Sequence, residues 1–370
     1  MVAAAKGHAT KTYLGIMTDT DTIIIDTTAR IFRELADPQT LATSNRDDWQ
    51  GPLWTALEES GLTRAWVPDD LGGAGAEITD GFDILVTAGR FAVAVPLAET
   101  LLAGWLLARA GIPVPDGPLS VAVGGQEAPI TVGADGILSG SARAVPFAGA
   151  VGHLALLAEQ DGAMAVALVD ASSCTIEVGT NLAGEPLGNV SFDGVTPITV
   201  SAAPDGLSPG DVMLMGAAIR AQQMAGGLQG VLDLAVDYAK ERVAFGRPIA
   251  KFQAVQHNLA RLAGEVAAAV AAAGSAADSI QTTEDFNEAV FLEIAAAKIR
   301  TGEAVGTGAG IAHQVFGAIG FTAEHVLQRY TKRLWAWRDD FGSESEWAVG
   351  LGAMVAANGA DELWPLVASR

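Results

Sequence analysis

Arg242, Phe245 and Gln253 are the residues whose types and spacing best suit chemistry. They fall within residues 238–260, YAKERVAFGRPIAKFQAVQHNLA, where the pattern predicts a helix ending near Arg242, a turn at Pro248 and a new helix after it. A guanidinium can form two hydrogen bonds to a phosphate, a phenyl ring offers a face to a flat ring, and an amide can donate or accept. Together the three suit a dinucleotide. Taken singly, each also has a structural explanation: an ion pair for Arg242, core packing for Phe245 and a turn cap for Gln253.

The same stretch resembles the sequence signature of the acyl-CoA dehydrogenases in their C-terminal helical domain. In that family the matching Arg, Phe and Gln hold FAD across a subunit interface. The resemblance therefore implies FAD as the cofactor, bound by Arg242, Phe245 and Gln253. It covers most of the chain, because the family also has the order helices, β domain, helices.

A second segment, HQVFGAIGF at residues 313–321, resembles the same family's Gln-x-x-Gly-Gly-x-Gly-Phe turn near the flavin pyrophosphate. Gln314 and Gly317 agree with it, and Ala318 stands where a second Gly is common. Because this contact uses backbone N–H groups, an Ala serves if its φ is negative and fails if its φ must be positive. We expect Ala318 to make this contact in place of the Gly. We interpret His313 as a packed or capping histidine.

The catalytic base is harder to place. In the family a carboxylate removes the acyl α-proton while the flavin accepts a hydride from the β-carbon. Many members carry this Glu just before a Gly-Thr/Ser pair, and by register that position is Phe341, before Gly342 and Ser343. Other members carry it on an earlier helix, at the position of Gly216. Neither position holds a carboxylate in this chain.

Asp340 is the nearest candidate base, because it lies one residue out of register, and Asp339 and Glu344 come next. A shift of one residue in a loop would bring Asp340 to the substrate. In the structural alternative, Asp339 and Asp340 are solvated partners of Arg333 and Arg338. Both interpretations remain open at this stage.

Other residues depart from the family pattern. In LSGSARAVPFAGA, residues 138–150, the flavin-lining positions hold Ala144, Val145 and Pro146, and AVGGQEA at residues 122–128 replaces another flavin-contacting segment. The resemblance assigns no flavin contacts to these side chains. Five further residues have no expected role toward the substrate: Arg220, Gln222, Trp335, Trp337 and Trp347.

The elements that must position these residues follow from changes in hydrophobic period. Apolar residues recur at helical spacing over residues 22–111, short Val-, Ile- and Thr-rich runs fill residues 119–200, and the helical period returns from Ser208 onward. We therefore predict an α+β, mainly α protein with a helical domain, a small antiparallel β domain and a C-terminal four-helix bundle. The predicted domains span residues 17–118, 119–205 and 206–370.

Composition limits the classes of function. The 370 residues carry a net charge of −21, which repels phosphate backbones and anionic lipid, so nucleic acid and membrane surfaces are poor partners. The single cysteine, Cys174, permits neither an intramolecular disulfide nor a thiolate metal cluster, so we expect no metal site and a reducing, cytoplasmic location. Residues 91–107 are too interrupted to span a membrane and predict a core helix. Residues 1–16 lack the apolar stretch of a signal peptide and are interpreted as an extension or a start-site artefact.

The resemblance gives a leading hypothesis and two alternatives. The leading one is an FAD-dependent acyl-CoA dehydrogenase that oxidises the Cα–Cβ bond of an acyl-CoA thioester and passes electrons to an electron-transfer flavoprotein. The first alternative is one subunit of a mixed α2β2 assembly whose partner provides the base, and the second is a non-catalytic scaffold of the same fold. A homo- or hetero-tetramer is expected, because Ala-rich helices over residues 266–297 would otherwise stay partly exposed.

Overall fold

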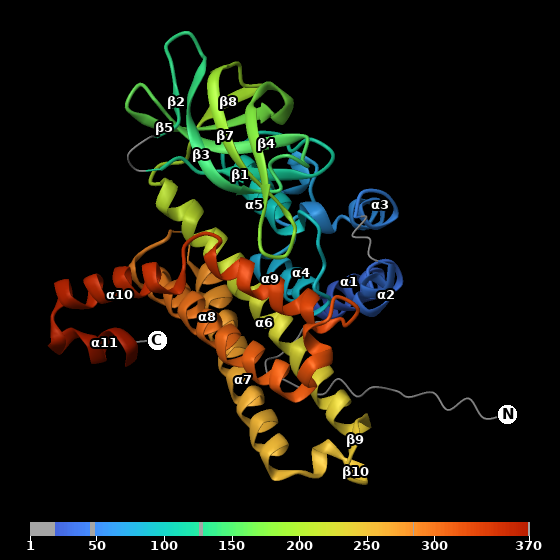
Figure 1. Ribbon diagram of the computed structural model, residues 1–370. Coiled ribbons are helices and arrows are strands. Elements are labelled where there is room, and N and C mark those ends of the chain that lie inside the picture. Colours follow the sequence, from blue (N-terminus) through green and yellow to red (C-terminus); the bar gives the residue numbers. More distant parts are fainter. Residues whose placement is uncertain (1–18, 45–48, 126–128, 284, 369–370) are drawn as a thin grey trace.

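A computed structural model describes residues 19–44, 49–125, 129–283 and 285–368 (Figure 1). Residues 1–16, and residues 126–128 of the AVGGQEA segment, lie outside the described residues. The order of elements is helices, then a sheet, then helices, as the hydrophobic period predicted. The protein is mostly helical, so the predicted fold class is confirmed. The domain boundaries remain a prediction.

The N-terminal part is helical. Its elements are α1 (Asp19–Leu35), α2 (Pro38–Ser44), α3 (Pro52–Glu59), the 3-10 turns η1 (Leu62–Arg64) and η2 (Asp69–Leu71), α4 (Ile78–Arg90) and α5 (Leu97–Arg109). Helix α5 starts directly after Pro96, and its residues 97–107 are all buried, which makes it a core helix as predicted. The Glu77 side chain and Asp80 form a capping box that fixes the start of α4.

The middle part is an eight-stranded sheet that packs on α5 (Figure 1). Its elements are β1 (Leu119–Ala122), β2 (Thr131–Val132), β3 (Leu138–Pro146), β4 (His153–Gln160), β5 (Ala163–Asp170), η3 (Ala171–Ser173), β6 (Thr175–Thr180), β7 (Pro186–Val195) and β8 (Thr199–Ala202). The strand order is β6-β7-β3-β2-β4-β5-β8, and β1 pairs with β4.

The prediction of an antiparallel domain was wrong for two of the strand pairs. Strands β1 and β2 both pair with β4 in parallel, so the sheet is mixed. The chain passes through β2 and β3 between β1 and β4, and such a long connection permits parallel pairing, whereas a tight hairpin does not. The remaining pairs, including the full-length β4–β5 ladder, are antiparallel as expected.

The C-terminal part is a helical bundle with two appendages. Its elements are α6 (Pro209–Glu241), β9 (Val243–Ala244), β10 (Arg247–Pro248), η4 (Ile249–Lys251), α7 (Gln253–Thr282), α8 (Glu288–Phe316), η5 (Gly317–Phe321), α9 (Leu327–Asp339), α10 (Glu344–Asn358), η6 (Ala360–Glu362) and α11 (Leu363–Ala368). Ser208 and Asp211 form a capping box at the start of α6. Helices α6, α7, α8 and α9 pack together, and α10 and α11 project from the bundle (Figure 1).

Helix α6 also contacts the N-terminal helices closely. A Cβ added at Gly226 would lie 1.9 Å from the Val86 carbonyl oxygen, and one added at Gly89 would lie 2.1 Å from the Gln223 carbonyl oxygen. Only residues without a Cβ allow the backbones of α4 and α6 to approach in this way. The two glycines therefore join the N-terminal and C-terminal helices into one packed unit.

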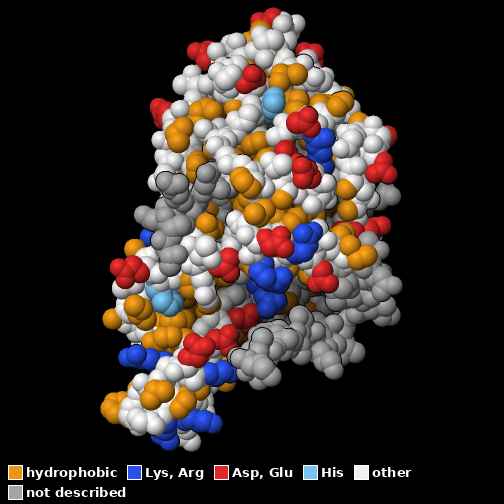
Figure 2. All heavy atoms as spheres, turned by 90° about the vertical axis from the view of Figure 1, so that its right-hand side faces the viewer, with side chains coloured by type: hydrophobic (Ala, Val, Ile, Leu, Met, Phe, Trp, Pro, Cys, Tyr) orange, Lys and Arg blue, Asp and Glu red, His pale blue; other side chains and the backbone are white. Residues whose placement is uncertain are grey.

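Helix α7 stands out for an apolar face that the chain leaves uncovered. By length and composition it could cross a membrane, the only such helix among the described residues, and 28% of its most apolar 18-residue window is buried. Small residues at helical spacing, including Ala260, Gly264, Ala267 and Ala271, are exposed. On the face shown in Figure 2, acidic side chains predominate over the upper part and basic side chains gather at the lower end.

Candidate functional site

The segment between α6 and α7 forms an exposed arm at one end of the bundle (Figure 1). Strands β9 and β10 pair across a turn at Phe245 and Gly246, whose φ values are +52° and +79°. Two successive left-handed residues give the tight two-residue turn that hairpins prefer. The turn presents Phe245 to solvent with 96% of its surface exposed, so the core-packing explanation for this residue was wrong.

Arg242 and Gln253 flank the arm and are also exposed. Arg242 follows the last residue of α6, and its carbonyl accepts a hydrogen bond from Ile249 N at 2.8 Å, which closes the arm. Gln253 begins α7, and its side chain forms no capping hydrogen bond there. No ion pair joins Arg242 to a carboxylate within the described ranges. All three predicted cofactor residues are therefore free to meet a ligand or another subunit.

The second predicted cofactor segment lies beside the base of the arm. Tyr238, near the end of α6, stacks on Phe316 with ring centroids 4.4 Å apart. Helix α8 ends there, Gly317 takes a φ of +67°, and Ala318 is not among the left-handed residues. Ala318 thus meets the condition under which an Ala can replace the second Gly. Gln314 is exposed on the last turn of α8.

His313 is packed, as the sequence indicated. Its ring stacks on Phe321, with centroids 4.3 Å apart, and on Trp335 at 5.9 Å. Its Nε2 lies 3.1 Å from the Thr331 hydroxyl. Burial lowers the pKa of His313, with a smaller contribution from His325. The imidazole is therefore a neutral packing group rather than an acid or base exposed to substrate.

Gly216 and Phe341, the two positions predicted for a base, face each other. A Cβ added at Gly216 would lie 2.3 Å from Cδ1 of Phe341, so the Phe341 ring fills the space that a side chain at 216 would take. Phe341 has a φ of +53°, and its carbonyl accepts a hydrogen bond from Trp347 Nε1 at 3.0 Å. The sequence counts were thus spatially consistent: both positions border the same small volume.

The Asp340 side chain contacts Arg220 on α6. Its Oδ2 lies 2.9 Å from both Nε and Nη2 of Arg220, which stands four residues after Gly216. Its side chain is 11% exposed. Burial raises the pKa of Asp340, and the Arg220 guanidinium opposes that rise. Asp340 is a nearly buried carboxylate held by Arg220, which lies about one helical turn after Gly216 on α6.

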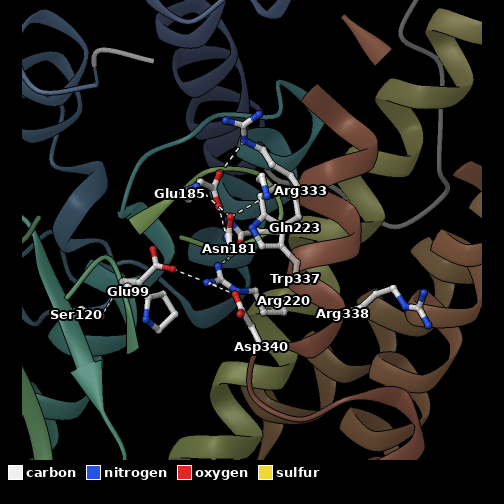
Figure 3. A network of polar contacts seen from close by, with 12 residues as sticks. Glu99, Ser120, Asn181, Glu185, Arg220, Gln223, Arg333, Trp337, Arg338 and Asp340 are labelled. Atoms are coloured by element: carbon white, nitrogen blue, oxygen red, sulfur yellow. Dashed lines mark hydrogen bonds and ion pairs between the residues drawn. The ribbon is translucent and has the colours of Figure 1, made fainter. Parts of the chain in front are cut away.

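Arg220 is the centre of a buried polar cluster that sequence reasoning missed (Figure 3). Its Nη2 also donates to Oε1 of Glu99, on α5, at 2.5 Å, and its Nη1 donates to the Gln223 side chain. Burial works to lower the pKa of Arg220, but Glu99 and Asp340 outweigh it and the net change is upward. For Glu99, burial raises the pKa and Arg220 opposes the rise. The cluster joins α5, α6 and the loop after α9.

The structural alternative, in which Asp339 and Asp340 pair with Arg333 and Arg338, was also wrong. Arg333 forms a buried ion pair with Glu185 instead, and Arg338 pairs with Glu344. Glu344 is therefore engaged, while Asp339 is exposed at the end of α9.

A second buried basic side chain, Lys298, holds the end of α9 and the loop that follows it. Its Nζ donates to the carbonyls of Trp337, Arg338 and Asp340 at 2.9, 2.9 and 2.8 Å.

Comparison with known proteins shows which protein family the chain resembles. The family described as "Acyl-CoA dehydrogenase, C-terminal domain" matches residues 212–338. Acyl-CoA dehydrogenase IpdE2 of Mycobacterium tuberculosis is 29% identical over 311 residues, covering 83% of this chain and 88% of that protein. Residues 212–338 thus match the acyl-CoA dehydrogenase family, and the likeness to IpdE2 extends over most of the chain. Acyl-CoA dehydrogenase FadE34 of the same organism is 30% identical, covering 85% of this chain and 43% of its own length.

A solved structure shows the same acyl-CoA dehydrogenase fold over nearly the whole chain. The ChsE4-ChsE5 complex from Mycobacterium tuberculosis aligns with a TM-score of 0.79 at 22% identity, covering 93% of this chain and 99% of the matched one. At that identity the likeness shows the fold alone.

The predicted cofactor residues are of the kinds that suit one half of a flavin nucleotide. The arm and the end of α8 present a cation, an aromatic ring and two exposed amide side chains, those of Gln253 and Gln314. On β3 the flavin-lining positions hold Ala144, Val145 and Pro146, and Ala144, with φ +51°, donates its N–H to the Asn189 side chain at 3.1 Å. The next residue, Phe147, is buried against Trp49. The sheet side of the site thus offers no polar side chain at these positions.

Proposed function

We propose that this chain is a subunit of an FAD-dependent acyl-CoA dehydrogenase, which removes hydrogens from Cα and Cβ of an acyl-CoA thioester. The observation that carries the proposal is the exposed Arg242–Phe245–Gln253 arm beside the η5 turn, in a chain that resembles this family. FAD, when bound, supplies the group that accepts the hydride. The acceptor of the electrons is proposed to be an electron-transfer flavoprotein, and the location cytoplasmic.

The arm's residues have separate proposed tasks. Arg242 holds a phosphate of FAD with two charge-assisted hydrogen bonds, and Phe245 packs its face against a flat ring. Gln253 donates or accepts one further hydrogen bond. Gln314, Gly317 and Ala318 border the pyrophosphate, and Ala318 binds it through its backbone N–H, since the Gly317 N–H donates to the His313 carbonyl. None of these tasks requires a side chain from the sheet of the same chain.

The arm is proposed to act on FAD held by an adjacent subunit. Phe245 projects fully into solvent, and nothing in the described chain approaches it except Phe252, with ring centroids 6.2 Å apart. The exposed small residues of α7 give a surface on which another helix can pack closely, and monomers seldom leave such a surface open. These two features support a dimer or a tetramer, formed from copies of this chain or from this chain and a related one.

The catalytic base within this chain is proposed to be Asp340. Its carboxylate is held by Arg220, and burial favours its protonated form, so it could take the substrate's α-proton. The step would need the carboxylate to leave Arg220 and reach a carbon beside Gly216. A movement of the loop over residues 339–342 would provide that reach.

The Gly216–Phe341 contact favours a second candidate function. Both positions that carry the family's base are filled by residues without a carboxylate, and the sheet lacks polar flavin-lining side chains. A subunit of that kind would contribute the arm to a partner's FAD while the partner provides the base. The solved ChsE4-ChsE5 complex is an assembly of two named components, which makes such a pairing plausible for this fold.

The decisive experiment is anaerobic flavin reduction. The purified protein, alone and co-expressed with a related subunit from the same organism, is scanned for flavin absorbance and then mixed with octanoyl-CoA. Bleaching by the protein alone supports the homomeric enzyme. Bleaching that appears only on co-expression supports the second candidate. A protein that carries no flavin in either preparation overturns both.

A further inference from the structure

Phe341 occupies a notch in α6 that only a glycine can leave open. At Gly216 an added Cβ would lie 2.3, 2.5 and 2.7 Å from Cδ1, Cγ and Cε1 of Phe341. Real Cβ atoms do not approach this closely, so the ring lies directly over the glycine. The contact joins the middle of a buried helix to a loop that follows α9.

Four separate contacts hold the ring in the notch. Asp340 is anchored by Arg220, whose guanidinium carbon also lies 5.7 Å from the Phe341 ring centroid. Lys298 donates to the Asp340 carbonyl at 2.8 Å, and Trp347 donates to the Phe341 carbonyl at 3.0 Å.

The backbone at Phe341 shows how strongly this position is held. A φ of +53° is costly for a residue with a bulky aromatic side chain. Such a conformation persists only where contacts with the surrounding structure stabilise it. Gly342, with φ +90°, follows directly. The conformation of the loop therefore places the Phe341 ring against Gly216.

We propose that Phe341 is a plug that excludes the acyl chain from the space beside Gly216, and so determines which ligands this chain's own site admits. The proposal rests on the second candidate function, in which this chain contributes the arm and its partner provides the base, so that no acyl α-carbon has to lie beside Gly216. With the ring in place, the chain admits the CoA portion of a thioester but gains no affinity from its acyl chain. The Glu99–Arg220–Asp340 cluster acts as the anchor of the plug.

The test compares octanoyl-CoA with free CoA on the purified holoprotein by isothermal titration calorimetry. The variant Phe341→Gly removes the ring and suits the positive φ. Phe291→Ala is the matched control, because Phe291 is another partly buried phenylalanine that packs on Trp347, with ring centroids 6.0 Å apart. The wild type and the control are expected to bind both ligands with similar affinity. Phe341→Gly is expected to bind octanoyl-CoA about tenfold or more tightly than the wild type does, because acyl CH₂ groups gain burial, with CoA unchanged.

Two results would overturn the plug: a wild type that already prefers octanoyl-CoA to CoA by about tenfold, or a Phe341→Gly variant with no gain. If no protein binds either ligand, the proposed function fails, and a thermal double-mutant cycle decides the plug without a ligand. Gly216→Ala should lower the melting temperature in the wild type and leave it unchanged or higher in the Phe341→Gly background. Equal effects of Gly216→Ala in both backgrounds would show that the ring does not occupy the notch.

Discussion

Glu185 and Arg333 form a buried ion pair, with 2.8 Å between Oε1 and Nε, that fastens the turn between β6 and β7 to helix α9 (Figure 3). Their side chains are 6% and 3% exposed. Asn181 supports the turn by donating its amide to Glu185 Oε2 at 3.0 Å. The pair is thus a specific attachment between the sheet and the C-terminal helices.

Replacing Glu185 with Gln should destabilise the protein strongly. The change keeps the shape and removes the carboxylate charge that faces the buried Arg333 guanidinium, and breaking a buried ion pair costs about 3 kcal/mol or more in comparable cases. Urea unfolding measures the free energy of unfolding, and Glu177→Gln on the exposed face of β6 is the control, expected to stay within about 0.5 kcal/mol of the wild type. A Glu185→Gln protein as stable as the control would mean that the pair contributes no net stability.

Arg242→Ala should lower flavin occupancy. The lost charge-assisted phosphate contact is of order 1.5–3 kcal/mol, which corresponds to roughly a tenfold or greater loss of affinity. Flavin retained after gel filtration, measured by absorbance, reports the effect. Arg261→Ala, an exposed arginine farther along α7, should retain wild-type occupancy. Equal occupancy in the two variants would remove Arg242 from the cofactor site.

Asp340→Asn separates the two proposed sources of the base. If Asp340 is the base, flavin reduction by octanoyl-CoA should fall by about 10²-fold or more while flavin binding persists. Asp339→Asn changes an exposed neighbour and should leave the rate unchanged. An active enzyme that is indifferent to Asp340→Asn would direct attention to a partner subunit.

Lys298 should give the stability a characteristic pH dependence. Burial lowers the pKa of Lys298 to about 7, with Asp340 opposing the change and Arg220 adding to it. Between that value and the ordinary lysine pKa the unfolded chain binds one more proton than the folded chain, so the unfolding free energy should rise with pH, by at most about 1.4 kcal/mol per unit. Below pH 7 both states are protonated and the slope vanishes. The variant Lys298→Met should lack the rise, and parallel curves for the two proteins would contradict it.

Ala271→Glu should break the subunit contact proposed for α7. A buried charge on a surface of small residues is costly, so the oligomer should shift to monomer in sedimentation velocity runs. Ala163→Glu, on an exposed position of β5, serves as the control and should sediment as the wild type does. An unchanged distribution for Ala271→Glu would place the interface elsewhere.

Features that depend on residues close together in the sequence were predicted from it. Changes of hydrophobic period predicted the order of helices and sheet, and the Pro- and Gly-marked segment after Arg242 predicted the turn that forms the arm. The parallel pairs of β4 were missed because pairing between strands separated by other strands leaves no local pattern. Arg220 was missed for a similar reason: its carboxylate partners Glu99 and Asp340 lie 121 and 120 residues away.

The base illustrates a different limit. Counting residues led to two separate positions, Gly216 and Phe341, and the structure brings them into contact. Counting could not show that a ring fills the glycine's notch, or that Asp340 is turned toward a guanidinium one helical turn away. Side-chain direction depends on neighbours that the fold brings together from elsewhere in the chain.

The close crossing of α4 and α6 restricts how the molecule can move. Because Gly89 and Gly226 let the two backbones touch, sliding of one helix over the other would force side chains into main-chain atoms. The N-terminal and C-terminal helices should therefore behave as a single rigid body. Motion that admits a large ligand would then fall to the loops and to the sheet, which the ion pair between Glu185 and Arg333 attaches to this body.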